Sequence, residues 1–276
     1  MMSQVKTVLR HYRNLAQLTA EMILPTRTSL ELGVRGKMSQ RDIHLEIPSL
    51  LLSQMFPRDF TTAEPVKILP GTALDGGPNV YEQFILCALV QKIQPKTILE
   101  IGTFRGGTTW HLYENAAPDT VIYTLDLPDD EVPGDVSNIQ LAANKARPFL
   151  PKSDRVHQIL VNSQNWKPDL DRKVQFAFID ADHTYKGIRN DTEKALTTLD
   201  EYACICWHDS LESDYGYGTL NYLLELTRQG WKIFRLRSMH EISSITIWMT
   251  DSMLKQLNIP ETRTGTAYMF RDYVGR

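Results

Sequence analysis

The chain has 276 residues, 42% of them hydrophobic, and a formal net charge of −3 at pH 7. This length suffices for one large domain with an appendage, and the slightly acidic balance argues against a nucleic-acid-binding surface, which carries an excess of basic residues. No apolar run approaches the roughly 20 residues that cross a bilayer, and residues 1–25 lack the apolar core of a signal peptide, so we expect a cytoplasmic protein that binds neither nucleic acid nor a membrane.

The first 65 residues differ in character from the rest of the chain. Apolar residues recur at helical spacing between Val5 and Met22, which predicts an amphipathic helix, and an irregular stretch with three prolines follows it. We interpret residues 1–65 as a helical N-terminal appendage. It is either a lid over a site or a contact between the subunits of a homo-oligomer, and the sequence does not decide between the two.

From Asn79 onward, helix-like and strand-like segments alternate. The predicted helices are 80–93, 106–116, 137–146, 185–199 and 219–229, and the predicted strands are 96–102, 120–127, 155–161, 174–180, 202–209, 231–237 and 243–249. Such alternation indicates an α/β fold with a doubly wound, Rossmann-like, mostly parallel seven-stranded sheet. The last two strands leave no room for a helix between them, so we expect an antiparallel last strand.

The three cysteines, Cys87, Cys204 and Cys206, predict no disulfide. Cys204 and Cys206 lie two residues apart on one predicted strand and point to the same face, an arrangement that disfavours a bond between them. We interpret all three as buried thiols in a reducing compartment.

A glycine-rich turn joins the strand at 96–102 to the next helix, in the sequence ILEIGTFRGGTTWHL. In open α/β sheets this turn lies at the carboxyl edge, where nucleotide-like ligands bind. Gly102 would let the backbone approach a ligand, and Gly106 would open the helix with exposed N–H groups. Glu100 would suit a ligand with a cationic amino-acid portion. Phe104 replaces the second glycine of the dinucleotide fingerprint, which argues against an NAD-dependent oxidoreductase; a purely structural tight turn is the alternative.

The next predicted strand ends in Asp126. An acidic side chain at that strand tip can accept hydrogen bonds from both hydroxyls of a ribose. The alternative is an ordinary aspartate that caps the following turn.

Taken together, these segments resemble class I S-adenosylmethionine-dependent methyltransferases. The order and spacing of EQFILCALVQKIQPKTILEIGTFRGGTT, IYTLDL, FIDADHTYKGIRND and CICWHDS resemble the small-molecule O-methyltransferase branch, which includes catechol, caffeoyl-CoA and macrolide-sugar O-methyltransferases. The resemblance runs from about residue 72 to 249 and implies a methyltransferase domain at 66–276. It implies that S-adenosylmethionine is held by Glu100, Gly102, Gly106 and Asp126, with Asn162 and Ser163 near its adenine.

The apolar run Phe176–Ile179 is typical of a strand that is buried on both faces. Polar residues follow directly after it. Tips of adjacent strands lie about 4.8 Å apart, so Asp180 and Asp209 could share a divalent cation, most simply Mg²⁺. Metal-dependent relatives carry an acidic pair or an Asp–Asn pair where this chain has His208 and Asp209, so the resemblance implies a ligand at His208 although a histidine departs from the family pattern. Histidine is a softer ligand that is more usual for Zn²⁺, Mn²⁺ or Fe²⁺.

His183 is the candidate general base, because an imidazole with an ordinary pKa of about 6.5 can take a proton from a hydroxyl at neutral pH. A histidine that merely caps the next helix is the alternative. The predicted reaction is methyl transfer from S-adenosylmethionine to a hydroxyl of a small molecule of the sugar or phenolic type, assisted by a cation. The competing prediction is a non-catalytic S-adenosylmethionine-binding module that acts through protein contacts.

Overall fold

The computed structural model describes residues 47–56, 65–69, 77–128, 147–211, 217–238, 242–257 and 259. The helices predicted near the N-terminus and at 137–146 lie outside these residues. The fold described below is that of the unit formed by residues 48–265. None of the helices in the described part of the chain is long and apolar enough to span a bilayer.

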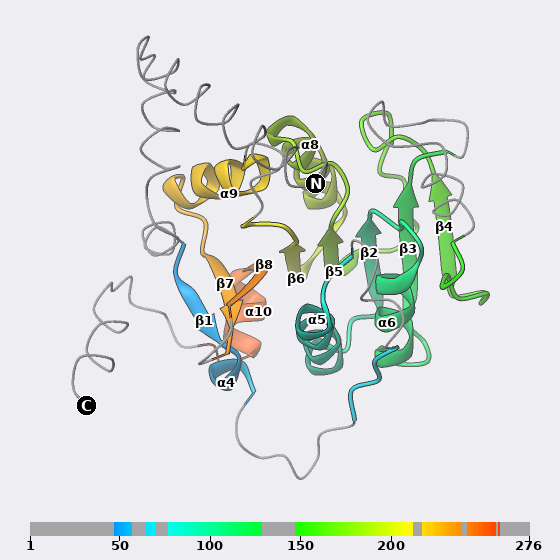
Figure 1. The fold of residues 1–276 in the computed structure, drawn as a ribbon, viewed down its shortest axis with the longest axis horizontal. Coiled ribbons are helices and arrows are strands. Elements are labelled where there is room, and N and C mark those ends of the chain that lie inside the picture. Colours follow the sequence, from blue (N-terminus) through cyan, green and yellow to red (C-terminus); the bar gives the residue numbers. More distant parts are fainter. Residues whose placement is uncertain are drawn as a thin grey trace, which may run out of the picture. The chain divides into compact units, whose positions relative to one another are not determined.

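An eight-stranded sheet has the order β1-β7-β8-β6-β5-β2-β3-β4 (Figure 1). The strands are β1 (Ser49–Leu51), β2 (Thr97–Ile101), β3 (Val121–Asp126), β4 (Val156–Leu160), β5 (Val174–Ile179), β6 (Leu199–Trp207), β7 (Ile233–Arg237) and β8 (Ile242–Met249). β8 runs antiparallel to both β6 and β7, and the other pairs are parallel. The predicted doubly wound, mostly parallel sheet with an antiparallel last strand is confirmed.

The eighth strand, β1, comes from the segment that we assigned to the appendage. It pairs in parallel with β7, Leu50 opposite Leu236, and the side chain of Leu50 is fully buried. Three residues are too few to show a period, which is why the sequence predicted seven strands. The sheet therefore begins before residue 66, and the role of the preceding residues stays a prediction.

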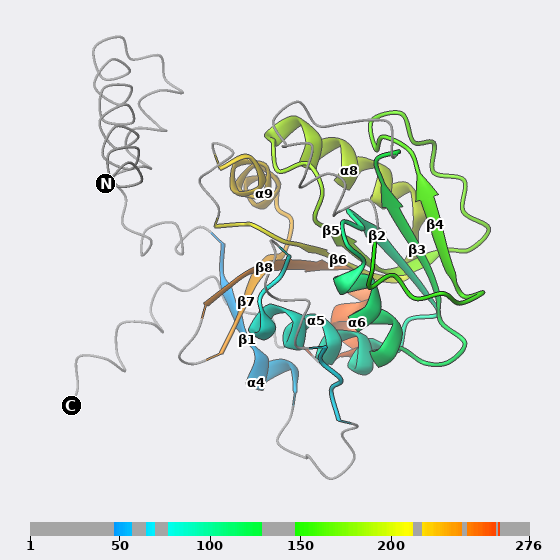
Figure 2. The same cartoon turned by 45° about the vertical axis from the view of Figure 1, so that its right-hand side comes forward.

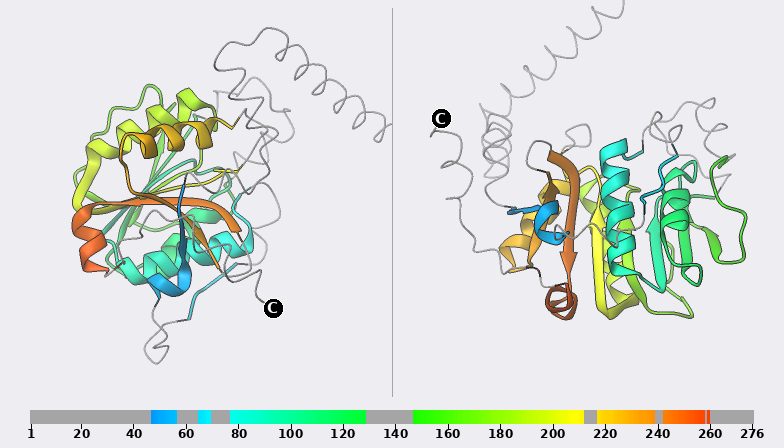
Figure 3. Two further views of the ribbon diagram at one scale, coloured as in Figure 1. Left: turned by 90° about the vertical axis from the view of Figure 1, so that its left-hand side faces the viewer. Right: turned by 90° about the horizontal axis from the view of Figure 1, so that it is seen from below.

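Helices cover both faces of the sheet. They are α4 (Leu52–Met55), α5 (Val80–Ile93), α6 (Gly107–Asn115), α8 (Tyr185–Thr198), α9 (Gly218–Arg228) and α10 (Asp251–Gln256). α5 and α6 lie on one face, and α8 and α9 on the other (Figures 2 and 3). Because both faces are covered, every residue of β2 is buried, as are the cysteines, which remain free thiols.

The core forms between α5, α6 and the central strands. Its largest members include Ile85, Leu89, Ile98, Phe176, Phe178 and Ile247. Each such side chain contributes about 1.5–3 kcal/mol when fully buried. The parallel order of β3, β2, β5 and β6 brings their carboxyl ends to one edge of the sheet, and this edge holds the candidate site.

Candidate active site

The turn after β2 requires glycine at position 102. Gly102 has a φ of +108°, and a Cβ added there would lie 2.1 Å from the backbone oxygen of Asp180. Its N–H donates to the carbonyl of Leu125 at 2.8 Å. The turn is thus held between the ends of β3 and β5, so the predicted cofactor turn and the predicted catalytic strand tip are in direct contact.

Glu100 lies fully buried beneath this turn. Thr109 Oγ1 donates to its Oε2 at 2.5 Å, and Thr124 Oγ1 donates to the same atom. The other oxygen, Oε1, has no hydrogen-bond partner among the residues that the structure describes. Burial raises the pKa of Glu100 to about 8, against the two hydroxyl contacts. A cationic group brought to Oε1 would supply the missing partner and favour the carboxylate.

Asp126 and Gly106 also lie at this edge. The Oδ1 of Asp126 accepts from the N–H of Leu127 at 2.8 Å, while Arg147 Nη2 lies 3.6 Å from Oδ2. The side chain of Asp126 is 23% exposed. Gly106 caps α6 with a φ of +82°, and an added Cβ would lie 2.5 Å from the N atom of Leu150. Both residues lie at the carboxyl edge of the sheet, and their contacts with a cofactor stay a prediction.

Asn162 and Ser163 lie in the loop after β4, the strand next to β3. Asn162 Oδ1 accepts from the N–H of Gln164 at 2.9 Å. Lys194 of α8 donates to the carbonyl of Ser163 at 2.5 Å. Hydrogen bonds therefore form within this loop and between the loop and α8, at the same sheet edge as Asp126.

These residues fit S-adenosylmethionine. The orphaned oxygen of Glu100 suits the ammonium of its amino-acid portion, and Asp126 has a partly exposed carboxylate at the neighbouring strand tip.

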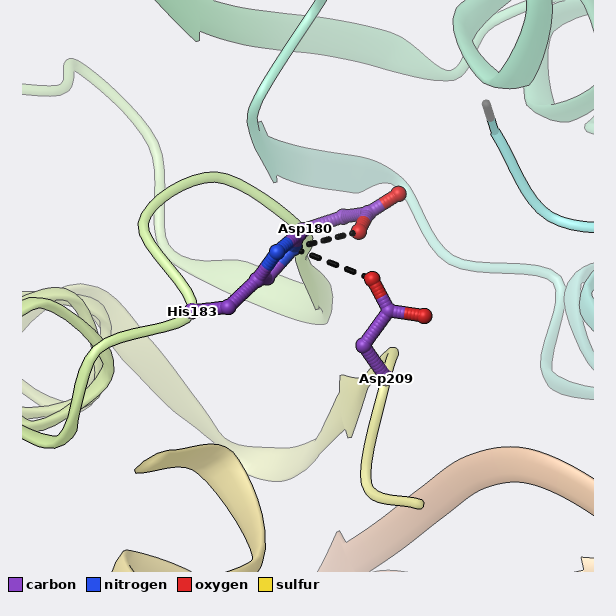
Figure 4. Close-up of side chains that lie close together, drawn as sticks. All are labelled: Asp180, His183 and Asp209. Carbon is purple, nitrogen blue, oxygen red and sulfur yellow. Dashed lines mark hydrogen bonds and ion pairs between the residues drawn. The ribbon is translucent and has the colours of Figure 1, made fainter. Parts of the chain in front are cut away.

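Asp180, His183 and Asp209 converge beside the glycine turn (Figure 4). Asp180 follows β5, His183 precedes α8, and Asp209 follows β6. His183 Nε2 lies 3.3 Å from Asp180 Oδ1 and 3.2 Å from Asp209 Oδ2. One ligand atom from each of the three residues lies within 4.8 Å of the others, close enough to hold one metal ion. Asp209 has a φ of +51°, an uncommon conformation for a residue with a side chain.

His208 lies next to this cluster, with both ring nitrogens facing carboxylates. Its Nδ1 is 3.1 Å from Asp180 Oδ1 and 3.0 Å from Asp209 Oδ1. Its Nε2 is 3.1 Å from Glu82 Oε2. Neither nitrogen offers a free lone pair in this arrangement, which favours a charged imidazolium over a metal ligand.

The charged groups of this cluster shift one another's pKa values toward the ionised forms. Burial lowers the pKa of His208, but Asp180, Asp209 and Glu82 together raise it well above its usual value. Burial raises the pKa of Asp180, but the two histidines hold it well below its usual range. Burial also lowers the pKa of His183, and again the aspartates outweigh it and raise that pKa above 6.5. His208, as an imidazolium, thus stabilises the ionised aspartates, and His183 adds to this whenever it is protonated.

Sequence reasoning missed Glu82. It stands three residues after Asn79 at the start of α5, and the two side chains form a capping box. That spacing marks a helix start, and it says nothing of a contact with a residue 126 positions away.

The sequence of this region also matches known proteins. Residues 99–210 match the family model of a methyltransferase domain. This part of the chain is similar to methyltransferase domains. The predicted resemblance to S-adenosylmethionine-dependent methyltransferases, and with it the enzyme class, is confirmed for this range. The match starts within β2, spans the glycine turn and α8, and ends just after Asp209.

The chain is also similar to solved structures. An O-methyltransferase from Bacillus cereus in complex with SAH has a TM-score of 0.48 and 17% identity, over 65% of this chain and 85% of that chain. A SAH-bound methyltransferase from Podospora anserina has a TM-score of 0.45 and 18% identity, over 61% and 78%. An O-methyltransferase from Streptomyces achromogenes, in complex with SAM, has a TM-score of 0.45 and 14% identity, over 63% and 82%. No curated protein matches the sequence significantly.

Proposed function

We propose that this protein transfers a methyl group from S-adenosylmethionine to a hydroxyl of a small molecule of the sugar or phenolic type, assisted by a divalent cation. The observation that carries the proposal is the convergence of Asp180, His183 and Asp209 against the glycine turn. A module that only binds the cofactor has no need of such a cluster, because grouping buried charges is costly.

S-adenosylmethionine would be held by Glu100, Gly102, Gly106, Asp126, Asn162 and Ser163, and it supplies a sulfonium methyl group that an oxygen nucleophile can displace. Glu100 would pair with the ammonium and Asp126 with the ribose hydroxyls. The contact between Gly102 and the backbone of Asp180 sets the distance from the cofactor turn to the catalytic cluster, so proximity and orientation supply much of the rate.

His183 would act as the general base. Its Nε2 would take the hydroxyl proton as the acceptor oxygen forms its bond to the methyl carbon and the carbon–sulfur bond breaks. The raised pKa of His183 makes the neutral imidazole a stronger proton acceptor. Asp180 and Asp209 would hold the cation, whose charge stabilises a developing alkoxide.

The test is methyl transfer from labelled S-adenosylmethionine over a panel of hydroxyl compounds, with a chelator titration. We expect chelation to abolish transfer while cofactor binding stays nearly intact. Asp209→Ala should reproduce this loss of transfer and should also lose the bound metal. Asp182→Ala is the matched control, since Asp182 Oδ1 accepts a turn hydrogen bond from the N–H of Thr184 at 2.9 Å and, among the described residues, lies outside the cluster of possible metal ligands.

His183→Ala should instead lower the rate about 10²–10⁴-fold without releasing the metal. Its residual activity should rise with pH as the acceptor ionises unaided. Full activity in excess chelator, with no metal in the purified protein, would refute the cation and leave His183 as the base. Cofactor binding with no transfer to any acceptor would support the non-catalytic module.

A further inference from the structure

Glu82 is a buried carboxylate that reaches the catalytic cluster from α5. Its Oε1 accepts from both the backbone N–H and the hydroxyl of Ser244 in β8, each at 2.7 Å. Its Oε2 accepts from the N–H of Asn79 at 3.1 Å and lies 3.1 Å from His208 Nε2. One side chain therefore joins the start of α5, strand β8 and the residue that follows β6.

His208 extends this connection to the aspartates. Its Nδ1 lies within 3.1 Å of an oxygen of Asp180 and an oxygen of Asp209, so one ring nitrogen faces both carboxylates. Two ionised carboxylates at adjacent strand tips repel each other, and a donor placed between them offsets that repulsion. The ring can hold this place only while its orientation is kept, and Glu82 contacts the opposite nitrogen.

We propose that Glu82 is a positioning residue, which orients His208 so that its Nδ1 holds Asp180 and Asp209 together beside His183. The proposal rests on the proposed function, because the two aspartates matter only if they act in transfer. In this proposal His208 is not a cation ligand. Its ring contacts both carboxylates and sets the distance between them.

The decisive variant is Glu82→Gln. If the amide oxygen keeps the two donors from Ser244, the amide NH₂ faces His208 and the N–H of Asn79, so the ring loses its acceptor. Removing a partner that orients a ligand typically lowers activity about 10–100-fold. We expect a fall of this size in kcat, with the KM for S-adenosylmethionine unchanged, since Glu82 contacts Asn79, Ser244 and His208 and not the cofactor turn itself.

Ser244→Ala is the matched control. It removes a hydrogen bond of 2.7 Å from the same carboxylate, at the oxygen that does not face His208. If Glu82 acts only by bracing α5 against β8, the two variants should lose kcat equally, and that result would overturn the proposal. Loss of kcat in Glu82→Gln, with wild-type kcat in Ser244→Ala, would support it.

Crystal structures of both variants give a readout that needs no activity. The proposal expects the His208 ring to leave its place in Glu82→Gln and the two carboxylates to separate, with no such change in Ser244→Ala. A ring that stays in place together with a lowered kcat would overturn it, as would wild-type kcat with a displaced ring. If Glu82→Gln does not fold, His208→Gln takes its place, and wild-type kcat in that variant would overturn the proposal.

The wild-type protein separates this proposal from the proposed function. If it binds S-adenosylmethionine but methylates no acceptor, the proposed function fails. The crystal structures then decide the positioning role alone: an unmoved ring in Glu82→Gln overturns it, and a displaced ring with separated aspartates supports it.

Discussion

Glu82 and Glu100 are both almost fully buried, at 4% and 0% exposure, yet they are expected in opposite charge states. Burial raises the pKa of each. Glu82 has a cationic neighbour in His208 and two donors from Ser244, which bring its pKa down to about 2. Glu100 has only two threonine hydroxyls, so its pKa stays near 8. The partners, and not the depth of burial, decide which glutamate carries a charge at neutral pH.

This difference makes the stability of the cofactor-free protein depend on pH through Glu100. Below pH 4.5 the side chain is protonated in both states. Between pH 4.5 and 8 the unfolded chain releases the proton and the folded protein keeps it, so stability is lost as pH rises to about 8. Glu100→Gln should lack this loss, which is on the order of a few kcal/mol.

Urea unfolding of both proteins at pH 5 and pH 8 measures the difference. We expect similar stability at pH 5, a more stable variant at pH 8, and weaker binding of S-adenosylmethionine by the variant. Parallel loss of stability in both proteins would show that Glu100 does not retain its proton.

Asp126→Ala should weaken the binding of S-adenosylmethionine, because the ribose hydroxyls lose their acceptor. A hydrogen bond to a charged group is worth about 1.5–3 kcal/mol, or roughly ten- to a hundredfold in affinity. Calorimetry measures the effect. Asp171→Ala is the control, since Asp171 accepts from Tyr123 of the same strand β3 and is no part of the candidate site. Unchanged affinity in a folded Asp126→Ala protein would refute the ribose contact.

At the scale of elements, two turns bring the strand tips together. The turn after β2 fits against the end of β5 only because Gly102 has no Cβ. The start of α9 fits against the loop before α8 for the same reason, since a Cβ on Gly218 would lie 2.2 Å from the backbone oxygen of His183. The position of the catalytic loop therefore depends on close backbone contacts from both sides.

Gly102→Ala should lower both cofactor affinity and kcat, because the new Cβ must displace the backbone of Asp180. Gly230→Ala is a matched control: it also has a positive φ, of +95°, and its Cβ would meet nothing within 4 Å. The control should cost about 1 kcal/mol of stability from backbone strain and leave kinetics unchanged. Thermal unfolding and steady-state kinetics measure both. Equal effects of the two substitutions would mean that strain alone, and not the contact with Asp180, matters.

At the scale of the whole molecule, the sheet includes a strand from a part of the sequence that is far from its neighbouring strand. β1 comes from residues 49–51 and adds to β7, which lies near the other end of the sequence. Arg235 of β7 donates its N–H to the carbonyl of Pro48 at 2.9 Å. The folded unit therefore includes residues that precede the predicted domain start at 66.

A chain that begins at residue 48 should be more stable than one that begins at residue 66. The shorter chain loses β1 and the buried side chain of Leu50, and a single Leu→Ala change in a core costs about 2–5 kcal/mol. Urea unfolding compares the two chains, with Leu50→Ala in the longer one expected between them. Equal stability would mean that β1 does not contribute to the free energy of unfolding.

Local pattern was enough to determine most of the fold, whereas the candidate site residues came mainly from the resemblance to methyltransferases. Strand and helix periods, and the absence of helix room before β8, gave the sheet and its antiparallel strand. The resemblance implied that the strands before Asp180 and Asp209 are neighbours, and parallel strands end at a common edge, so the two aspartates were expected to meet there. The structure adds His183 to the pair.

Only the tertiary structure decided the contacts that join distant segments. Glu82 meets His208 and Ser244 across 126 and 162 residues, and no local period carries that information. The orientation of the His208 ring and the protonation of Glu100 depend on which partners packing leaves beside them. β1 is too short to show a period and forms because β7 offers an edge with which its backbone can pair. Spacing along the chain predicts where a residue lies on its helix or strand. Its charge state and its hydrogen-bond partners depend on which residues the fold places next to it.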